Sequence, residues 1–207
     1  MPADTGRSYW EKHAKRYDAS TRFLSRPVPR MLELAVEASR GRAKALEVAA
    51  GTGLLTTAVA PVVESLIATD YATAMVDHLS ARVREANLTN VVCQQADLYD
   101  MQFSPATFDA ALAANVLHLV PDLEGALASL RRVLKPDGVL IIPTYLHAQT
   151  LTARVLARVL ALTRFPASRR FTFDSFRHAI SSAGFHITRS EIIPGPFPVG
   201  YVEAAPS

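Results

Sequence analysis

Short apolar runs alternate with stretches of helical periodicity along most of the chain. Apolar runs typical of buried strands occupy residues 43–50, 66–69, 91–96, 108–115 and 139–142. Helices are predicted between these runs. One begins within residues 54–60, and apolar residues at helical spacing indicate two more at residues 72–86 and 123–134. The K-P-D-G segment at residues 135–138 predicts a turn, because proline ends a helix and glycine permits a reversal. Parallel neighbours need right-handed crossover connections, so the alternation predicts a parallel sheet with helices on both faces.

The last third of the chain departs from this alternation. Helices are predicted over residues 149–163 and 174–183, and the second is followed by Gly184. Two further apolar runs, at residues 185–191 and 197–204, flank a Pro-Gly-Pro segment. This pattern predicts a closing antiparallel pair of strands.

Composition places the chain among ordinary globular proteins. Its 207 residues are 49% hydrophobic and 20% charged, so we expect one domain. Cys93 is the only cysteine, which excludes a disulfide within the chain and a cysteine-rich zinc site, and no metal site is expected. The sequence shows no secretory signal and no run of about 20 apolar residues that could span a membrane. These features predict a cytoplasmic protein.

Charge is distributed unevenly along the chain. Residues 1–44 carry 10 Lys or Arg against 5 Asp or Glu, residues 45–145 carry 5 against 11, and residues 146–207 carry 7 against 3. An acidic centre between basic flanks favours a partner or acceptor with negative charge at the flanks. The arginines are scarcely interleaved with aromatic residues that could stack on bases, so no nucleic-acid partner is expected.

Glycines cluster at the predicted junction between the first strand and its helix, in E-V-A-A-G-T-G at residues 47–53. Glycine lets the backbone approach a ligand, and the first helical N–H groups lie at a positive dipole end. Thr56 stands where a dinucleotide fingerprint has its third glycine, which weakens an NAD hypothesis. Asp70 lies 19 residues after Gly51, at the end of the next strand, where it can accept hydrogen bonds from ribose hydroxyls. The spacing predicts a nucleoside-containing ligand.

Five motifs in order resemble the class I S-adenosylmethionine-dependent methyltransferases, in particular the small-molecule and lipid enzymes that include the quinone C-methyltransferases. They are A-L-E-V-A-A-G-T-G, I-A-T-D-Y-A-T-A-M, Q-Q-A-D, F-D-A-A-L-A-A-N-V-L-H-L-V and R-R-V-L-K-P-D-G-V-L-I-I. The resemblance implies an α/β fold with a Rossmann-like, seven-stranded, mostly parallel sheet, an antiparallel last strand and helices on both faces. It implies a single methyltransferase domain over residues 1–207, with an N-terminal helical cap at 1–42 and an inserted lid-like helix at 146–172.

The same resemblance implies S-adenosyl-L-methionine as cofactor and S-adenosyl-L-homocysteine as product. Asp70 would hold the ribose, Tyr71 and Met75 would flank the adenine, Asp97 would accept from the adenine amine, and Asn115 would border the methyl end. The residues implied around the cofactor are Tyr17, Glu47, Gly51, Thr52, Gly53, Asp70, Tyr71, Met75, Asp97, Leu98, Asn115 and Val116. Ala49 departs from the family pattern, because it stands where the fuller motif has its first glycine.

Three side chains just after the fourth and fifth strands are candidates for catalysis or acceptor binding. They are His118, Tyr145 and His147, and the carboxyl ends of parallel strands would bring them to one cleft. A histidine there can act as a general base near the transferred methyl. A purely structural role is the alternative.

The segment at residues 151–165 has the pattern of an amphipathic helix. Apolar residues share one side, namely Leu151, Val155, Val159 and Leu162, and Arg154 and Arg158 lie on another. Three interpretations stay open: a lid with an apolar inner face, a helix lying on a membrane surface with its arginines on lipid phosphates, and an ordinary packed helix.

The leading functional hypothesis is methyl transfer to a small-molecule or lipid-like acceptor. The reaction would be an in-line displacement in which proximity and orientation supply most of the catalysis. One alternative is a non-catalytic protein that binds S-adenosylmethionine or a nucleotide, and another is an RNA methyltransferase. The single cysteine excludes arsenic methylation, and N-V-L-H after the fourth strand does not match the motif of DNA amino-methyltransferases.

Overall fold

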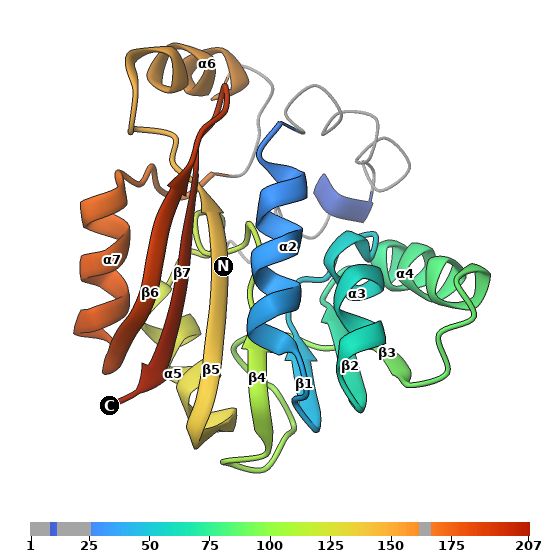
Figure 1. Cartoon of the computed structure of the whole chain (residues 1–207). Coiled ribbons are helices and arrows are strands. Elements are labelled where there is room, and N and C mark those ends of the chain that lie inside the picture. Colours follow the sequence, from blue (N-terminus) through green and yellow to red (C-terminus); the bar gives the residue numbers. More distant parts are fainter. Residues whose placement is uncertain (1–8, 12–25, 162–166) are drawn as a thin grey trace.

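The computed structural model describes residues 9–11, 26–161 and 167–207, and it is built around one sheet (Figure 1). The sheet has seven strands in the order β3-β2-β1-β4-β5-β7-β6. Its neighbours from β3 to β5 pair in parallel, whereas β7 runs antiparallel to both β5 and β6. The predicted α/β fold, with its closing antiparallel hairpin, is therefore confirmed.

The strands follow the predicted apolar runs closely. They are β1 (Lys44–Glu47), β2 (Ser65–Asp70), β3 (Val91–Gln95), β4 (Phe108–Leu112), β5 (Leu134–Tyr145), β6 (Phe185–Ile193) and β7 (Val199–Pro206). The central strands β1 and β4 are buried on both sides, as expected for parallel strands covered by helices on each face.

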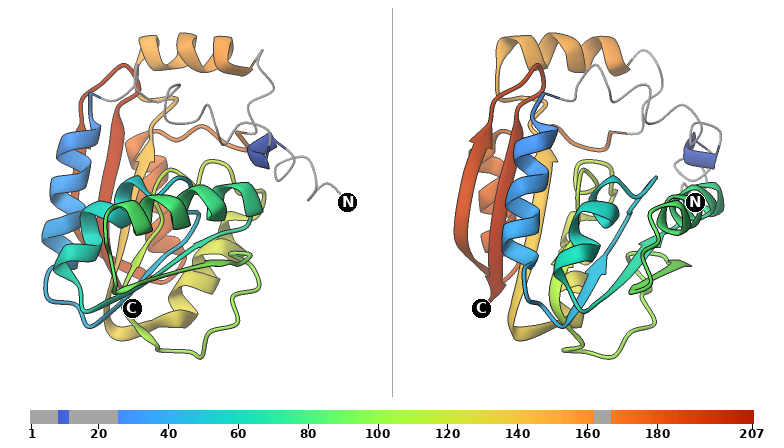
Figure 2. Two further views of the ribbon diagram at one scale, coloured as in Figure 1. Left: turned by 90° about the vertical axis from the view of Figure 1, so that its right-hand side faces the viewer. Right: turned by 45° about the vertical axis from the view of Figure 1, so that its right-hand side comes forward.

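Helices pack on both faces of the sheet. They are α2 (Val28–Ser39), α3 (Leu54–Val59) with the short η2 (Ala60–Val62), α4 (Thr73–Glu85), α5 (Leu123–Val133), α6 (Leu151–Ala161) and α7 (Phe173–Ser182). Leu34 and Leu55 join the core on the face that α2 and α3 cover. Leu127 and Phe176 join the core on the opposite face, which α5 and α7 cover. α6 lies apart from these layers, across one end of the sheet (Figure 2).

The K-P-D-G segment is not the predicted turn. α5 ends at Val133, and the segment is extended as part of β5. Phe108 pairs with Leu134 while Ala110 pairs with Val139, so β5 carries extra residues that bulge from the ladder. Proline fits extended backbone as well as a turn. A Cβ on Gly138 would lie 3.0 Å from the Lys135 carbonyl oxygen, so glycine allows the backbone segments to come close together there.

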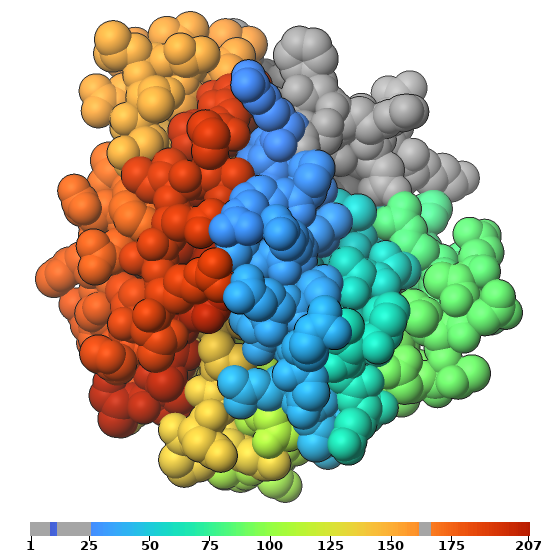
Figure 3. Space-filling model, in the orientation of Figure 1, coloured from blue at the N-terminus to red at the C-terminus, as the bar shows by residue number. Residues whose placement is uncertain are grey.

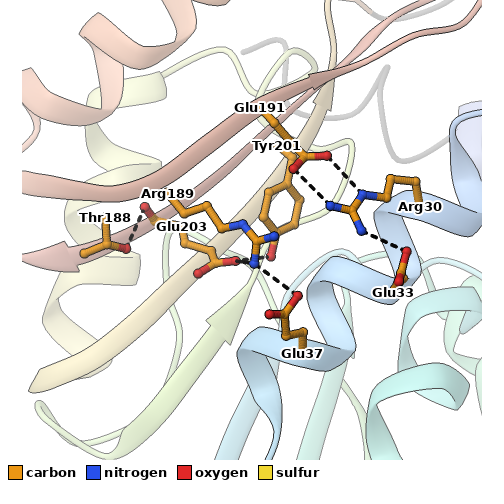
Figure 4. Close-up of polar contacts among 8 residues, drawn as sticks. All are labelled: Arg30, Glu33, Glu37, Thr188, Arg189, Glu191, Tyr201 and Glu203. Carbon is orange, nitrogen blue, oxygen red and sulfur yellow. Dashed lines mark hydrogen bonds and ion pairs between the residues drawn. The ribbon is translucent and has the colours of Figure 1, made fainter.

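α2 lies beside the β6–β7 hairpin on the surface of the molecule (Figure 3), and ion pairs join the two (Figure 4). Arg30 Nε lies 3.2 Å from Glu191 Oε1, and Arg189 Nη1 lies 3.1 Å from Glu37 Oε2. These pairs are exposed, so solvent screens them and their net contribution to stability is small. Burial of Leu34 and its apolar neighbours supplies more of the free energy that keeps α2 in place.

Candidate functional site

The loops that follow β1, β2, β4 and β5 meet at one edge of the sheet. The Ala50 amide donates to the Thr69 carbonyl at 2.9 Å, and the Asn115 amide donates to the Pro143 carbonyl at 2.8 Å. These hydrogen bonds tie each loop to the end of a neighbouring strand. Ligands of open α/β sheets bind at this edge, and most of the predicted site residues gather here.

The glycine-rich loop adopts the conformation that its sequence predicts. Gly51 and Gly53 have positive φ angles of 56° and 85°, and a Cβ on Gly53 would lie 2.7 Å from Leu79 Cδ1. Gly53 is therefore required by both backbone conformation and space. Ala49 also has a positive φ, 50°, which costs an L-residue about 1–2 kcal/mol. The loop thus keeps a left-handed residue at the position where the family pattern has glycine.

Asp70 connects this loop to the start of α4. Its Oδ2 accepts from the Gly51 amide at 2.9 Å, and its Oδ1 accepts from the Ala72 amide at 3.0 Å. The side chain is buried, and burial raises the pKa of the carboxyl group, while the backbone N–H donors oppose that rise. Each oxygen of an ionised carboxylate has a second lone pair, so Asp70 keeps the capacity to accept from ribose hydroxyls.

The N-terminal segment reaches the same place. Glu11 accepts from the Thr73 amide at 2.8 Å and from the Ala74 amide at 3.1 Å, which satisfies two of the free N–H groups at the start of α4. Trp10 packs with Tyr71 against the buried Met75. No local sequence pattern identifies Glu11, because its partner Thr73 lies 62 residues away.

Of the predicted cofactor residues, one falls outside the part of the chain that the structure describes and another is exposed after β3. Tyr17 lies outside the described residues. Asp97 is exposed after β3, and its Oδ1 accepts from the Tyr99 amide at 2.9 Å, which is a local turn contact. Leu98 is partly buried against the main core, and Thr52 is buried in the glycine loop. Adenine recognition by Asp97 stays a prediction.

Glu47 points toward α3. Its Oε2 accepts from the Thr56 hydroxyl at 2.6 Å, and its carbonyl oxygen accepts from the Thr69 hydroxyl at 3.1 Å. Thr56, the residue in place of a third glycine, thus uses its side chain to anchor α3 to β1. Glu47 is 2% exposed, and burial raises the pKa of its carboxyl group to about 8.

Replacing Glu47 with glutamine is expected to change how stability depends on pH. The folded protein keeps this carboxyl group protonated up to about pH 8, whereas the unfolded chain releases the proton near pH 4.3. The wild-type free energy of unfolding therefore falls, relative to that of Glu47→Gln, as pH rises through this window, by on the order of a few kcal/mol. Urea unfolding at several pH values measures the difference. Glu85→Gln, at an exposed position on α4, is the control; a wild-type minus Glu47→Gln difference that does not change with pH would contradict the prediction.

The three catalytic candidates converge at the ends of β4 and β5. The ring centroids of His118 and His147 are 4.8 Å apart, and that of Tyr145 lies 6.5 Å from His118 and 6.2 Å from His147. Phe197, from the turn before β7, closes the cluster with its ring 4.9 Å from His147. No local pattern distinguishes Phe197, because only the antiparallel β5–β7 pairing brings it to this edge.

Burial keeps both imidazoles neutral near neutral pH. It lowers the pKa of His147 to about 4, with the charge of Arg170 adding to the effect. It also lowers the pKa of His118 well below its usual range. A neutral imidazole can accept a proton. Near them in the sequence, Asn115 Oδ1 and Thr144 Oγ1 are buried, and neither has a hydrogen-bond partner among the described residues.

The turn that carries His118 is held by the chain after α6. The Ser168 and Arg169 amides donate to the His118 carbonyl at 3.0 and 3.1 Å. The Arg169 guanidinium donates to the Val120 carbonyl at 2.7 Å and to the Pro121 carbonyl at 3.1 Å. In the sequence, Arg169 is only one of several basic residues in the C-terminal part of the chain. In the structure, its hydrogen bonds hold the turn that carries His118.

α6 has an apolar side toward the protein and a second apolar side toward solvent. Ala153 and Ala157 are buried against Phe197 and Tyr145, and the partly buried Leu156 packs with them. Leu151, Val155 and Val159, on the other side of the helix, are exposed, and Leu162 lies outside the described residues. The interpretations as a lid, a membrane-surface helix and an ordinary packed helix all stay predictions.

The described residues offer neither a membrane-spanning helix nor a cluster of metal ligands. None of their helices is both long and apolar enough to cross a membrane. Their His, Cys, Asp and Glu side chains form no group of three or more that could hold a metal ion.

Comparison with known proteins agrees with this geometry. Residues 46–142 match the family model described as "Methyltransferase domain". The chain is 30% identical over 136 residues to the ubiquinone/menaquinone biosynthesis C-methyltransferase UbiE of Citrifermentans bemidjiense. The aligned region covers 62% of this chain and 58% of that protein. It is 35% identical over 107 residues to a highly reducing polyketide synthase of Alternaria alternata, of which it spans only 4%. The chain thus spans only part of these curated relatives.

Solved structures share the whole fold at low sequence identity. Magnesium protoporphyrin IX methyltransferase from Synechocystis PCC 6803, with bound S-adenosylhomocysteine, superposes with a TM-score of 0.78 at 17% identity, covering 97% of this chain and 98% of that one. The DhpI complex with S-adenosylhomocysteine gives a TM-score of 0.75 at 23% identity, covering 98% and 95%. The matched residues run from β1 into β5 and carry the loop and the acidic residue described above, so over this stretch the chain is similar to the class I S-adenosylmethionine-dependent methyltransferases.

Proposed function

We propose that this chain transfers a methyl group from S-adenosylmethionine to a small-molecule acceptor. The observation that carries the proposal is the buried Asp70 carboxylate, bound to the amides of the glycine loop and of α4 at the ligand-binding edge of the sheet. The buried pair His118 and His147 lies at the ends of β4 and β5, at the same edge. This combination suits a nucleoside-containing methyl donor beside a proton acceptor.

The residues present fit the cofactor. Asp70 would accept from the ribose hydroxyls, the loop at Gly51 and Gly53 would lie against the methionine part, and Asn115 Oδ1, which has no hydrogen-bond partner among the described residues, would accept from an ammonium group. Tyr71 and Met75 offer an apolar flank for the adenine. When bound, S-adenosylmethionine supplies a methyl group activated by a sulfonium.

His118 is proposed as the general base. A nucleophilic atom of the acceptor bonds to the methyl carbon, the carbon–sulfur bond breaks, and its electron pair goes to sulfur. The proton of the acceptor passes to the neutral imidazole of His118, while the ring contact with His147 and the hydrogen bonds of Arg169 keep its turn in place.

The acceptor is proposed to be a flat, apolar compound with an acidic hydroxyl or C–H group. Tyr145 and Phe197 surround the histidines with aromatic rings, which suits an apolar ring system. The names of the relatives point the same way, because they include enzymes that methylate quinone precursors and a magnesium porphyrin.

Calorimetric titration followed by a labelled methyl-transfer assay tests the proposal. We expect S-adenosylmethionine and S-adenosylhomocysteine to bind, and the label to move to a quinol or porphyrin and not to RNA. Absence of cofactor binding would overturn the proposal altogether. Binding without transfer to any acceptor would favour the non-catalytic binding protein, and transfer to RNA would overturn the acceptor class.

A further inference from the structure

The outer face of α6 is an apolar stripe. Leu151 is 78% exposed, and Val155 and Val159 are each 57% exposed. Their spacing of four residues aligns them along one side of the helix. The other exposed large hydrophobic residues of the described chain lie singly on other elements, so α6 alone gathers three of them. Apolar surface concentrated in this way usually marks an interaction site.

Arginines border this stripe. Arg154 and Arg158 are exposed and lie one turn apart, next to Leu151 and Val155 around the helix. The Arg154 Nε donates to the Ala148 carbonyl at 3.0 Å, which holds that side chain near the start of α6. The sequence of residues 146–173 contains five arginines and no Asp or Glu. The stripe is therefore set in a segment of purely positive charge.

We propose that α6 docks this protein onto an anionic lipid surface. Leu151, Val155 and Val159 enter the boundary between headgroups and acyl chains, and Arg154 and Arg158 bind lipid phosphates. A helix that combines an apolar side with arginines at its edge is the arrangement of interfacial membrane helices. Anionic headgroups complement the positive charge of the exposed Arg154 and Arg158.

A second copy of this chain fits the surface less well. A two-fold symmetric contact through α6 would bring the same arginines of both copies together. The helix has 11 residues, so it is about 16 Å long. One such helix face is far smaller than the roughly 800 Å² per partner of a stable protein interface.

The position of α6 links docking to the candidate site. Figures 1 and 2 place α6 across the end of the sheet at which the parallel strands finish. Its inner residues Ala153 and Ala157 pack on Tyr145 and Phe197, which belong to the histidine cluster. Docking would therefore hold the acceptor end of the protein at the lipid surface. That consequence rests on the proposed function, whereas lipid binding itself does not.

Cosedimentation with phosphatidylcholine vesicles, with and without phosphatidylserine, tests the proposal on the full chain. We expect binding to the phosphatidylserine vesicles that is roughly tenfold or more stronger than binding to phosphatidylcholine alone. Leu151→Gln/Val155→Gln should abolish binding to both, and Arg154→Gln/Arg158→Gln should remove only the gain from phosphatidylserine. The matched controls are Leu54→Gln/Ile192→Gln, at exposed apolar positions elsewhere, and Arg40→Gln/Arg84→Gln, which remove the same charge.

The outcomes separate the possibilities. Wild-type protein that stays in the supernatant with both vesicles, or controls that lose binding equally, would overturn the proposal. A dimer in light scattering that Leu151→Gln/Val155→Gln converts to monomer, without vesicle binding, would assign the stripe to a second copy instead. Calorimetry with S-adenosylmethionine on the same variants should give wild-type affinity, so failure of the methyltransferase proposal would be visible separately.

Discussion

Asp70→Ala is expected to weaken S-adenosylmethionine binding by about a hundredfold or more while the sheet stays folded. The substitution removes a carboxylate that would accept hydrogen bonds from both ribose hydroxyls, and a hydrogen bond to a charged group contributes about 1.5–3 kcal/mol. It also releases the Gly51 and Ala72 amides, which Asp70 now holds at 2.9 and 3.0 Å, so the loop loses its preorganisation.

Isothermal titration calorimetry measures this loss, and circular dichroism with thermal unfolding verifies the fold. Asp77→Ala removes a carboxylate from the exposed side of α4 and should bind the cofactor as the wild type does. Wild-type affinity in a folded Asp70→Ala variant would contradict the assignment of this edge to the cofactor.

His118→Asn is expected to lower kcat by about 10²-fold or more without changing the affinity for S-adenosylmethionine. Asparagine keeps a polar side chain in the buried cluster but cannot take up a proton. The folded-state pKa of His118 lies well below the ordinary value, so the base is already unprotonated at mildly acidic pH. Wild-type kcat should therefore be flat from neutral pH down through the usual histidine range and fall only at lower pH.

The low pKa of His118 also affects the stability of the protein. A depressed histidine pKa means that the unfolded chain binds the proton first, so the free energy of unfolding falls as pH drops below about 6.5. Burial acts in the same direction on His147, whose pKa is about 4.

Steady-state kinetics over a pH series, with the methyl acceptor identified by the transfer assay, measures the effect on kcat. His186→Asn, at an exposed position on β6, is the control. A kcat that titrates near pH 6.5 in the wild type, or an unchanged kcat in His118→Asn, would exclude His118 as the base.

Much of the fold and of the cofactor edge could be predicted from the sequence. Apolar periodicity located the strands and helices because each element buries one face or both. The glycine loop and Asp70 could be identified because few residues separate them in the sequence. A strand, a helix and a second parallel strand bring such residues together in any fold of this class. The prediction of a turn at the K-P-D-G segment was wrong, because proline and glycine are compatible with a bulged strand as well as with a turn.

The contacts that define the acceptor end depend on long-range packing. Phe197 reaches His147 only because β7 pairs antiparallel with β5, and Glu11 meets α4 across 63 residues of chain. The sequence determined that α6 is amphipathic with its arginines beside an apolar stripe. Only the tertiary structure decided which side faces outward, since Ala153 and Ala157 are small enough to pack closely on Tyr145 and Phe197, while Leu151, Val155 and Val159 stay exposed.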